Sequence, residues 1–386
     1  MPLPGISDKK VFSGKGALAQ LDTLTPAYKN ILVFNDRDGF HPCGAADYFI
    51  KAEKKFKGRI RYVSYAGKAL PLEDIEGKYR EVKHNTGVDL IIAVGGGTVI
   101  DLAKIISIAY CNRCEKVEEI LFNKELENKL DLIFIPTTAG TGSEATSFAV
   151  VYKDKVKFSI DNKSLLADYV VLDHLLLKSL PEPVLNATVL DALAQAIESG
   201  WAMGASDESR EYSKQAIKLI LDNIDKKKGN AIDIDRLSRL QMASHLAGKA
   251  INISKTTLPH SISYPITSHF GVPHGIAVFL TLPKAAELNY YTTADTAQGG
   301  IRPGHIEESF SLLFSLFNVE KIEELIEKLN EIMIRLKVNP RLHHYGITKQ
   351  DLHFLAANAL TKGRSDNNPR KVDSDSVLKL LKEIFL

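Results

Sequence analysis

The spacing of apolar residues changes once along this chain, between Ser179 and Pro183. Before that point, short apolar and β-branched blocks alternate with segments of helical spacing. Beyond it, apolar residues recur at every third or fourth position, which is typical of helices. Strands that alternate with helices favour a parallel sheet covered by helices. We therefore predict an α/β domain over residues 1–178 and an all-helical domain over residues 179–386.

The clearest strand signals are uninterrupted apolar blocks that end in polar residues or glycine, as in a parallel sheet that is buried on both faces. The predicted strands are residues 30–36, 60–64, 89–95 and 131–136. The predicted helices of the second half are residues 186–201, 208–224, 232–251, 321–336, 349–360 and 373–385. The chain has 386 residues, which is more than usually fold around one hydrophobic core, so two domains are favoured.

Composition excludes several classes of protein. Lys and Arg total 49 against 47 Asp and Glu. A protein that binds nucleic acid carries a concentrated basic surface, so this balance argues against a nucleic-acid partner. No apolar run reaches the roughly 18 residues of a membrane span, so no membrane association is expected. Three cysteines cannot build a disulfide framework, and we predict a cytoplasmic location.

Two loops rich in small residues follow predicted strands. The first begins at Gly95 and opens a helix, and glycines there let backbone N–H groups approach an anion. A tight turn without a ligand explains three glycines equally well. The second loop, residues 136–146, is crowded with hydroxyls, and two such loops on neighbouring parallel strands form a cofactor crevice. The predicted dinucleotide ligands are Gly95, Gly96, Gly97, Thr98, Asp101, Thr137, Thr138, Thr141 and Ser143.

Asp36 ends an earlier predicted strand. An acid at this place can accept hydrogen bonds from ribose hydroxyls and repel a 2′-phosphate. We therefore expect NAD(H) to be preferred over NADP(H). The alternative is that Asp36 only stabilises the turn after the strand.

Four residues of the second half have the chemistry of metal ligands. Asp191 and Gln195 lie four apart and share one helix face, while His260 and His274 lie fourteen apart. A carboxylate and two imidazoles can coordinate a divalent cation. Each of these residues taken alone is more often a core or surface residue.

Several sequence motifs, taken together, are specific for one protein family. They run from Phe12-Ser-Gly14 through the two loops, Asp191-Ala-Leu-Ala-Gln-Ala-Ile-Glu198 and Ala247-Gly-Lys-Ala250 to Pro273-His274-Gly275. In them the chain resembles the iron-containing (group III) alcohol dehydrogenases, relatives of glycerol dehydrogenase and dehydroquinate synthase, nearly from end to end. The resemblance implies a dinucleotide-binding domain, an all-helical metal domain, and reduction of an aldehyde or oxidation of an alcohol with NAD(P) and a divalent metal, Fe²⁺ or Zn²⁺.

Carried over residue by residue, Asp191, His260 and His274 match three of the four metal ligands of that family. Gln195 stands where the family has a histidine. An amide oxygen is a weaker ligand than imidazole for iron or zinc, so we expect a loosely held ion.

The resemblance also implies catalytic residues. Lys157 matches the family lysine that faces the nicotinamide, and Tyr264 stands where the family usually has a second active-site histidine. Both are expected to supply or relay the proton, and His269 is a weaker candidate that reads more simply as a surface histidine.

The substrate is expected to be anionic. Lys255, Thr256 and Thr257 replace the glycine and apolar residues that ordinary family members carry just before ligand His260, and Arg364 and Arg370 follow later in the chain. Trp201 and Glu208-Ser-Arg-Glu211, after the first metal helix, belong to the same pattern. This cluster looks like the phosphonoacetaldehyde reductase branch, which implies a role in phosphonate metabolism and 2-hydroxyethylphosphonate as the product. The alternative is that Lys255 is merely solvated in a loop.

Several other functions stay open at this point. The chain could be a general iron-type alcohol dehydrogenase, or a dehydroquinate-synthase-like lyase or a sugar- or polyol-phosphate dehydrogenase of the same superfamily. It could also be a degenerate member that binds a nucleotide without turnover, for which Gln195 is the best support. As in many relatives, a homodimer is expected.

Overall fold

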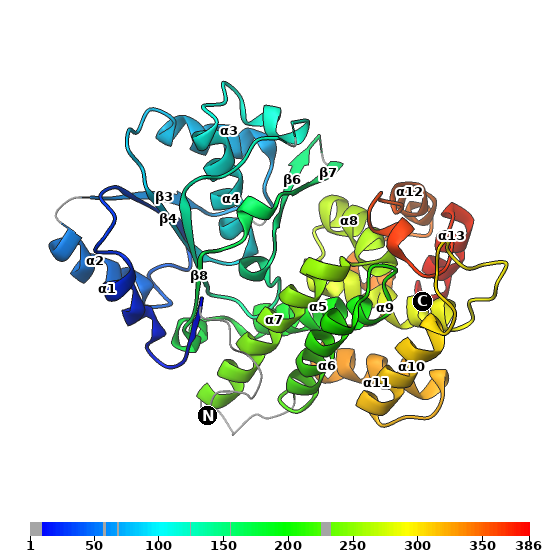
Figure 1. Cartoon of the computed structure of the whole chain (residues 1–386). Coiled ribbons are helices and arrows are strands. Elements are labelled where there is room, and N and C mark those ends of the chain that lie inside the picture. Colours follow the sequence, from blue (N-terminus) through cyan, green and yellow to red (C-terminus); the bar gives the residue numbers. More distant parts are fainter. Residues whose placement is uncertain (1–9, 57–58, 68, 124, 155, 225–232) are drawn as a thin grey trace. The chain divides into compact units, whose positions relative to one another are not determined.

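The computed structural model describes residues 10–56, 59–67, 69–123, 125–154, 156–224 and 233–386. The chain divides into two compact units, one of Met1–Leu180 with Lys228–Gln241 and one of Pro181–Lys227 with Met242–Leu386. Strands and helices alternate in the first unit, whereas the described part of the second is helical (Figure 1). The predicted fold class is confirmed. The predicted domain boundary after residue 178 stays a prediction, because a compact unit need not be a segment that folds alone.

The first unit is built on a six-stranded sheet in which every pairing is parallel. The strand order is β1-β8-β5-β4-β2-β3, so the chain moves outward from β2 to β3 and then returns to the other side of β2. This reversal makes the gap between β2 and β4 a topological switch point, where open α/β sheets bind their ligands. The strands are β1 Val11–Ser13, β2 Ile31–Asp36, β3 Ile60–Tyr65, β4 Leu90–Gly95, β5 Asp131–Pro136 and β8 Tyr169–Leu172.

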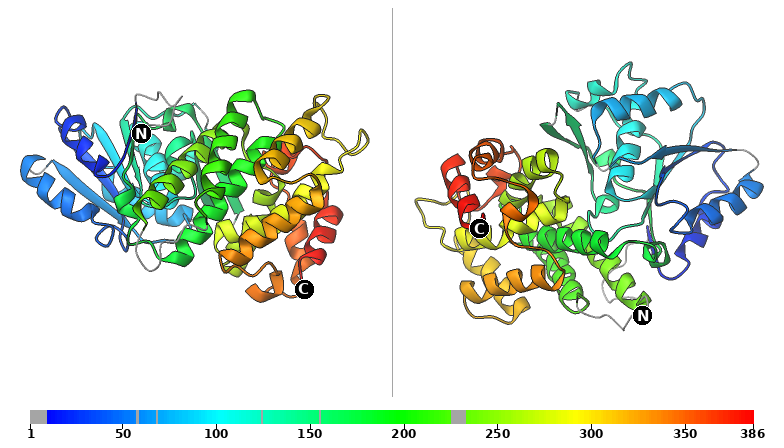
Figure 2. Two further views of the ribbon diagram at one scale, coloured as in Figure 1. Left: turned by 90° about the horizontal axis from the view of Figure 1, so that it is seen from below. Right: turned by 180° about the vertical axis from the view of Figure 1, so that it is seen from behind.

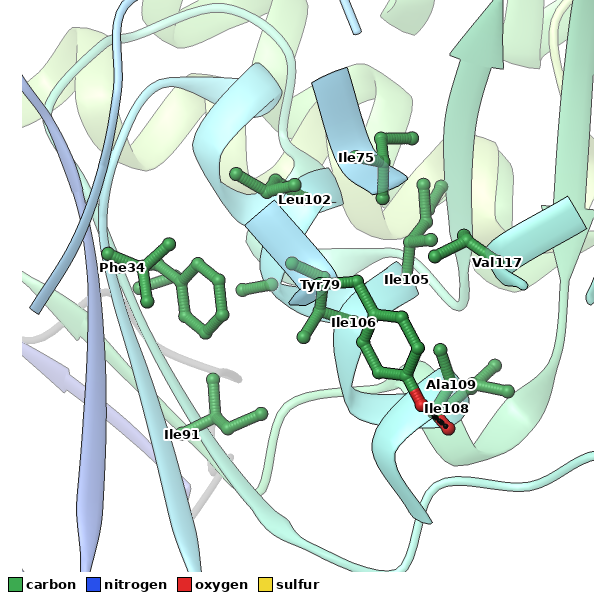
Figure 3. Packing of buried hydrophobic residues seen from close by; sticks show 14 of the residues in the cluster. Phe34, Ile75, Tyr79, Ile91, Leu102, Ile105, Ile106, Ile108, Ala109 and Val117 are labelled. Atoms are coloured by element: carbon green, nitrogen blue, oxygen red, sulfur yellow. Dashed lines mark hydrogen bonds between the residues drawn. The ribbon is translucent and has the colours of Figure 1, made fainter. Parts of the chain in front are cut away.

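The core of this unit lies where helices cover the sheet. All residues of β4 are buried, and so is most of α4, which follows it. Figure 3 shows the Tyr79 ring among Ile105, Ile106 and Ala109 of α4, with its hydroxyl donating to the Ala109 carbonyl at 3.0 Å. The helices are α1 Leu21–Leu24, α2 Ala45–Phe56, α3 Leu72–Val82 and α4 Gly97–Cys111, with short 3₁₀ turns at Ala17–Gln20, Val117–Leu121, Ser143–Ala145, Lys163–Leu165 and His174–Leu177.

A separate two-stranded antiparallel hairpin follows the second loop. It consists of β6 Phe148–Lys153 and β7 Val156–Asp161, with Tyr152 opposite Lys157. Neither strand is predicted by the sequence pattern. The hairpin carries Lys157, one of the two predicted catalytic residues.

The second unit contains nine helices among the described residues, counting α7, whose first residues belong to the first unit (Figures 1 and 2). Six of them correspond to predicted helices, although residue 232 of one prediction lies outside the described residues. The helices are α5 Glu182–Trp201, α6 Asp207–Leu221, α7 Ile234–Ser254, α8 Leu258–Phe270, α9 His274–Tyr290, α10 His305–Phe317, α11 Ile322–Arg335, α12 Asp351–Asn358 and α13 Ser374–Glu383, with 3₁₀ turns at Leu342–Tyr345 and Ser365–Asn367.

Helices α8, α9 and α10 were not predicted, and proline explains two of these omissions. Pro265 lies inside α8 and Pro283 inside α9. A proline inside a helix removes one backbone hydrogen bond, so the sequence pattern counts against a helix there. Packing in the buried centre of the unit outweighs that cost: the α8 residues from Leu258 to Ile266 are all buried.

A buried lysine shapes the loop after β5. Lys104 of α4 is fully buried, and its Nζ donates to the carbonyls of Ser143, Thr146 and Phe148 at 2.6, 2.8 and 2.9 Å. Burial lowers the pKa of Lys104 to about 8, and the Asp101 charge opposes this shift. One side chain therefore ties the first predicted cofactor loop, through α4, to the second.

We expect Lys104→Met to lower the free energy of unfolding by about 2 to 4 kcal/mol, because buried carbonyl groups lose their donor. Urea denaturation measures the change. Lys129→Met is the matched control, since the Lys129 side chain is exposed, and should change stability by less than about 0.5 kcal/mol. Equal effects of the two substitutions would contradict the role of Lys104.

Candidate functional site

The two predicted cofactor loops lie against each other in the first unit. Strands β4 and β5 pair up to their ends, with Gly95 opposite Pro136, so both loops leave the same edge of the sheet. A Cβ added at Gly97 would lie 2.6 Å from Thr141 Oγ1, and one added at Gly96 would lie 3.3 Å from Thr138 Cγ2. The glycines thus leave just enough room for the threonines of the second loop. Helix α4 begins at Gly97, and a helix N-terminus beside a loop of small residues suits a pyrophosphate.

Two residues predicted as dinucleotide ligands hold the loops together. The Ser143 hydroxyl donates to Asp101 Oδ1 at 2.5 Å, and Asp101 Oδ2 accepts the Val150 N–H at 3.0 Å. Burial raises the pKa of Asp101, while the charges of Lys104 and Lys157 oppose that rise. The Asp101 carboxylate is therefore engaged with the protein itself, and its observed role is to position the second loop.

Asp36 ends β2, next to the switch point. Its Oδ1 accepts the N–H groups of Asp38 and Gly39 at 3.0 and 3.2 Å. Asp36 therefore does stabilise the turn after β2, as the alternative interpretation expected. The carboxylate also lies at the strand edge where a ribose is expected, so the two roles are compatible.

Three predicted metal ligands meet in the second unit. Asp191 comes from α5, His260 from α8 and His274 from the first position of α9. Asp191 Oδ1 lies 3.4 Å from His260 Nε2 and 4.0 Å from His274 Nε2, and the three ligand atoms lie within 4.8 Å of one another. Asp191 Oδ1 is buried and makes no hydrogen bond within the described residues. A buried carboxylate oxygen facing two imidazole nitrogens fits a divalent cation.

The protonation states also suit a cation. Burial acts to raise the pKa of Asp191, but both histidines and a hydrogen bond from Gln195 bring it below its ordinary value, so the carboxylate is ionised. Burial acts to lower the pKa of His260, but Glu198 and Asp191 together raise it to about 10. Negative charge thus dominates this cluster, and a cation can take the place of the proton on His260 Nε2.

A close approach of two helices places His274. A Cβ at Gly275 would lie 2.0 Å from the Ala187 carbonyl oxygen and 2.8 Å from Asp191 Cβ. Glycine is therefore the residue that lets the first turn of α9 touch α5. Because His274 and Asp191 lie on these same turns, the contact brings the two ligands together.

The predicted catalytic residues fall in different units. Tyr264 is a buried residue of α8, and its ring stacks on His274 with centroids 6.1 Å apart. Lys157 is half-buried on β7, close enough to Asp101 for its charge to act on that carboxylate. His269 is exposed and its ring contacts Phe354, which agrees with its interpretation as a surface histidine.

The predicted substrate residues lie on two loops that are joined. Lys255 follows the last residue of α7 with φ of 63°, and Thr256 is buried. Asn367 Nδ2 donates to the carbonyls of Ser254 and Thr256 at 2.8 and 3.0 Å. The turn at Ser365–Asn367, which follows Arg364, therefore lies beside the Lys255 loop.

Comparison with known families decides the classification. The family model described as iron-containing alcohol dehydrogenase matches residues 8–174, and that of the C-terminal part of the Fe-containing alcohol dehydrogenase family matches residues 185–385. The chain belongs to the iron-containing alcohol dehydrogenase family. It is accordingly an NAD(P)-dependent alcohol dehydrogenase or aldehyde reductase.

Individual relatives of this iron-containing alcohol dehydrogenase are distant. A phosphonoacetaldehyde reductase of Streptomyces viridochromogenes is 29% identical over 304 residues, 76% of each chain. An NADPH-dependent butanol dehydrogenase of Clostridium saccharobutylicum is 27% identical over 98% of this chain and 96% of its own. The crystal structure of a sulfoacetaldehyde reductase from Bifidobacterium kashiwanohense in complex with NAD⁺ covers 97% of this chain and 96% of its own, with a TM-score of 0.82 and 21% identity.

The sequence also led to expectations about the membrane association, the oligomeric state and the cellular location of this dehydrogenase. None of its described helices is both long and apolar enough to cross a membrane. The homodimer and the cytoplasmic location stay predictions.

Gln195 separates this chain from the four-ligand pattern that the sequence resemblance implied. It lies one turn after Asp191 on α5, is buried, and donates to the Asp191 carboxylate. The described side chains that gather as ionisable ligands are thus Asp191, His260 and His274.

Glu198 is a site residue that the sequence pattern did not reveal. Its Oε1 lies 2.5 Å from His260 Nδ1, on the ring edge away from Asp191. The available signal was its position seven residues after Asp191, which places both carboxylates on one face of the same helix.

We expect Gly275→Ala to abolish retention of a divalent ion, because the added methyl group must push α9 away from the Ala187 carbonyl. Metal content after dialysis, measured by mass spectrometry, tests this. Gly271→Ala would be strained because φ there is 68°, so Gly299→Ala, which has open space around its Cβ, is the control. Retention unchanged in Gly275→Ala would show that the close approach is not required.

We expect Gln195→His to retain the ion more strongly than the wild type, since imidazole binds iron or zinc better than an amide does. The ion's rate of loss to an excess of chelator measures the change. An unchanged or faster loss would show that residue 195 is not directed at the ion.

Proposed function

We propose that this dehydrogenase reduces a small anionic aldehyde with NADH, and that phosphonoacetaldehyde is the substrate and 2-hydroxyethylphosphonate the product. The balance is one aldehyde, one NADH and one proton giving one alcohol and one NAD⁺. The hydride goes to the carbonyl carbon and the proton to the carbonyl oxygen.

The observation that carries this proposal is the position of Lys255, on a loop that Asn367 ties to the turn after Arg364. Its φ of 63° lies in the left-handed region, which costs a residue with a Cβ about 1 to 2 kcal/mol. Glycine would end α7 there without that cost. Lys337 follows α11 with a similar φ of 60°, so this conformation by itself marks a helix end. The place of Lys255, five residues before His260 and beside the turn of Arg364, is what favours a binding role.

A second cation supports an anionic tail. Arg364 is half-buried at the start of the turn that Asn367 ties to the Lys255 loop. Lysine and arginine donors make charge-assisted hydrogen bonds to phosphonate, sulfonate or carboxylate oxygens, and Arg can bind two of them at once. Thr256, next to Lys255, adds a hydroxyl. By contrast, Arg370 donates to the carbonyls of Leu288 and Tyr291 and serves the end of α9.

The names of two relatives agree with an anionic substrate. One is a phosphonoacetaldehyde reductase and another, from Bilophila wadsworthia, is a sulfoacetaldehyde reductase that is 28% identical. Both act on two-carbon aldehydes with an anionic tail. The relative named as an NADPH-dependent butanol dehydrogenase favours a second candidate, a dehydrogenase of neutral alcohols, since it matches 98% of this chain.

In the proposed mechanism Asp191, His260 and His274 hold the divalent ion. When bound, the ion supplies Lewis-acid polarisation of the carbonyl oxygen. Tyr264, stacked on His274, donates or relays the proton to that oxygen. The family resemblance gives Lys157, in the first unit, a place facing the nicotinamide and makes it the second candidate for supplying a proton. Lys255, Thr256 and Arg364 bind the anionic tail and orient the aldehyde.

In the first unit, the glycine loop and α4 hold the pyrophosphate, with Thr98, Thr137, Thr138 and Thr141 as hydroxyl donors. Asp36 binds the ribose and excludes a 2′-phosphate, so that NADH is preferred. The structure of a relative in complex with NAD⁺ agrees with this cofactor.

We expect Asp36→Asn to lower the ratio of kcat/KM with NADH to kcat/KM with NADPH by about tenfold, the equivalent of about 1.4 kcal/mol. Asparagine keeps an oxygen for the N–H groups of Asp38 and Gly39 and removes the charge alone. Asp38→Asn, which changes a neighbouring exposed acid that pairs with Arg37, is the control. A wild type that prefers NADPH would show the assignment of Asp36 to be wrong.

We expect Lys255→Asn to lower kcat/KM for phosphonoacetaldehyde roughly ten- to hundredfold, the loss of a charge-assisted contact of about 1.5 to 3 kcal/mol. A neutral aldehyde of similar length should be reduced as before. Asparagine tolerates the left-handed region, so the fold is spared. Lys337→Asn is the matched control, because Lys337 has a φ of 60° at the end of α11 and is exposed.

Equal losses of kcat/KM on the charged and the neutral aldehyde would contradict the binding of an anionic tail by Lys255. They would favour the second candidate, a dehydrogenase of neutral alcohols. Loss of activity in Lys337→Asn would instead show that a Lys→Asn change after any helix with a left-handed end lowers activity, whether or not the residue binds substrate.

A further inference from the structure

A chain of buried hydrogen bonds leads from Trp201 to His260. Trp201 Nε1 donates to Thr257 Oγ1 at 2.9 Å, and this hydroxyl donates to Glu198 Oε2 at 2.8 Å. The other carboxylate oxygen, Oε1, lies 2.5 Å from His260 Nδ1. Each member of the chain therefore fixes the next.

These side chains are out of reach of water. Glu198, Thr257 and Trp201 are 0% exposed and His260 is 4% exposed. A buried carboxylate needs a donor for each oxygen, because solvent cannot supply one. Here the donors are the Thr257 hydroxyl, the Thr257 N–H at 2.6 Å and the imidazole of His260.

The carboxylate keeps a hydrogen on Nδ1 of His260, so that Nε2 is the nitrogen that can exchange its proton for an ion. An ionised carboxylate only accepts hydrogen bonds, so Nδ1 must donate to it. The second nitrogen, Nε2, then faces Asp191 Oδ1 at 3.4 Å and is the nitrogen left to bind the ion, which takes the place of its proton. Partners of this kind, which fix a ligand histidine from behind, strengthen metal binding.

The same carboxylate fixes the start of α8. Thr257 is the residue before the first turn of that helix, and Glu198 accepts its backbone N–H. His260 lies three residues further on, in the first turn. Glu198 thus holds both the backbone from which His260 projects and the ring itself.

We propose that Glu198 is a positioning residue for the metal centre and that Thr257 and Trp201 hold it in place. The inference rests on the proposed function, in that Asp191, His260 and His274 are taken to bind the ion. It adds the residues that make His260 a ligand of defined orientation.

Glu198→Gln is the decisive variant, because neither orientation of the amide satisfies the site. With its oxygen toward His260, the amide NH₂ meets the Thr257 N–H. With its NH₂ toward His260, Nδ1 must accept, and the hydrogen moves to Nε2, the metal-facing nitrogen. We expect the affinity for Zn²⁺ or Co²⁺ alone, measured by competition with a chelating dye, to fall about 10- to 100-fold.

Two milder variants test the rest of the chain and remain informative where Glu198→Gln does not fold. Thr257→Val removes the hydroxyl, and Trp201→Phe removes the indole N–H while keeping a ring against Phe310, which stacks on Trp201 with centroids 6.0 Å apart. Both should weaken ion binding, by less than Glu198→Gln does. Trp201 is the only tryptophan of the sequence, so its fluorescence should change on ion binding in the wild type.

The controls separate positioning from general stability. Asn186→Ala breaks another buried hydrogen bond of α5, from Asn186 Nδ2 to the Leu336 carbonyl at 3.1 Å, and should leave ion affinity unchanged. Wild-type affinity in Glu198→Gln, or an equal loss in Asn186→Ala, would overturn the proposal. His274→Ala tests the underlying ion site: if it binds as tightly as the wild type, the proposed ion site fails, whatever Glu198 does.

Discussion

The metal cluster depends on one steric constraint, the contact between the first turn of α9 and helix α5. The Ala187 carbonyl occupies the space that any side chain at position 275 would need. A glycine there lets two helix backbones touch, so that His274 reaches the carboxylate of Asp191. Without this approach His274 would not reach Asp191, and the three ligands would not gather around one point.

Around that contact the second unit places an unusual amount of buried charge. Two carboxylates of α5, Asp191 and Glu198, face opposite edges of the His260 ring. Buried charges are costly unless they are paired and hydrogen-bonded. Here each carboxylate oxygen has either a protein donor or a place facing the two histidines, which is the arrangement expected of a site that takes up a cation.

The first unit uses a buried charge for a different purpose. Lys104 satisfies the carbonyls of the loop after β5, and Asp101 fixes the same loop through Ser143. The two residues belong to the glycine-loop motif that first indicated a dinucleotide. They hold the second loop in place, which leaves the glycines and threonines as the groups available to a cofactor.

The sequence by itself determined the strands next to the cofactor loops, most helices of the second unit and the candidate ligands Asp191, His260 and His274. The spacing of apolar residues and the positions of Gly and Pro are local signals, so they can be read from one sequence without its tertiary structure. Tertiary structure alone decided that α8 and α9 are helices despite their prolines, that Gly275 touches Ala187, and that Glu198 orients His260. These features depend on burial and on contacts between residues far apart in the chain. The local pattern places Glu198 on the helix face of Asp191, but it does not bring His260 to that face.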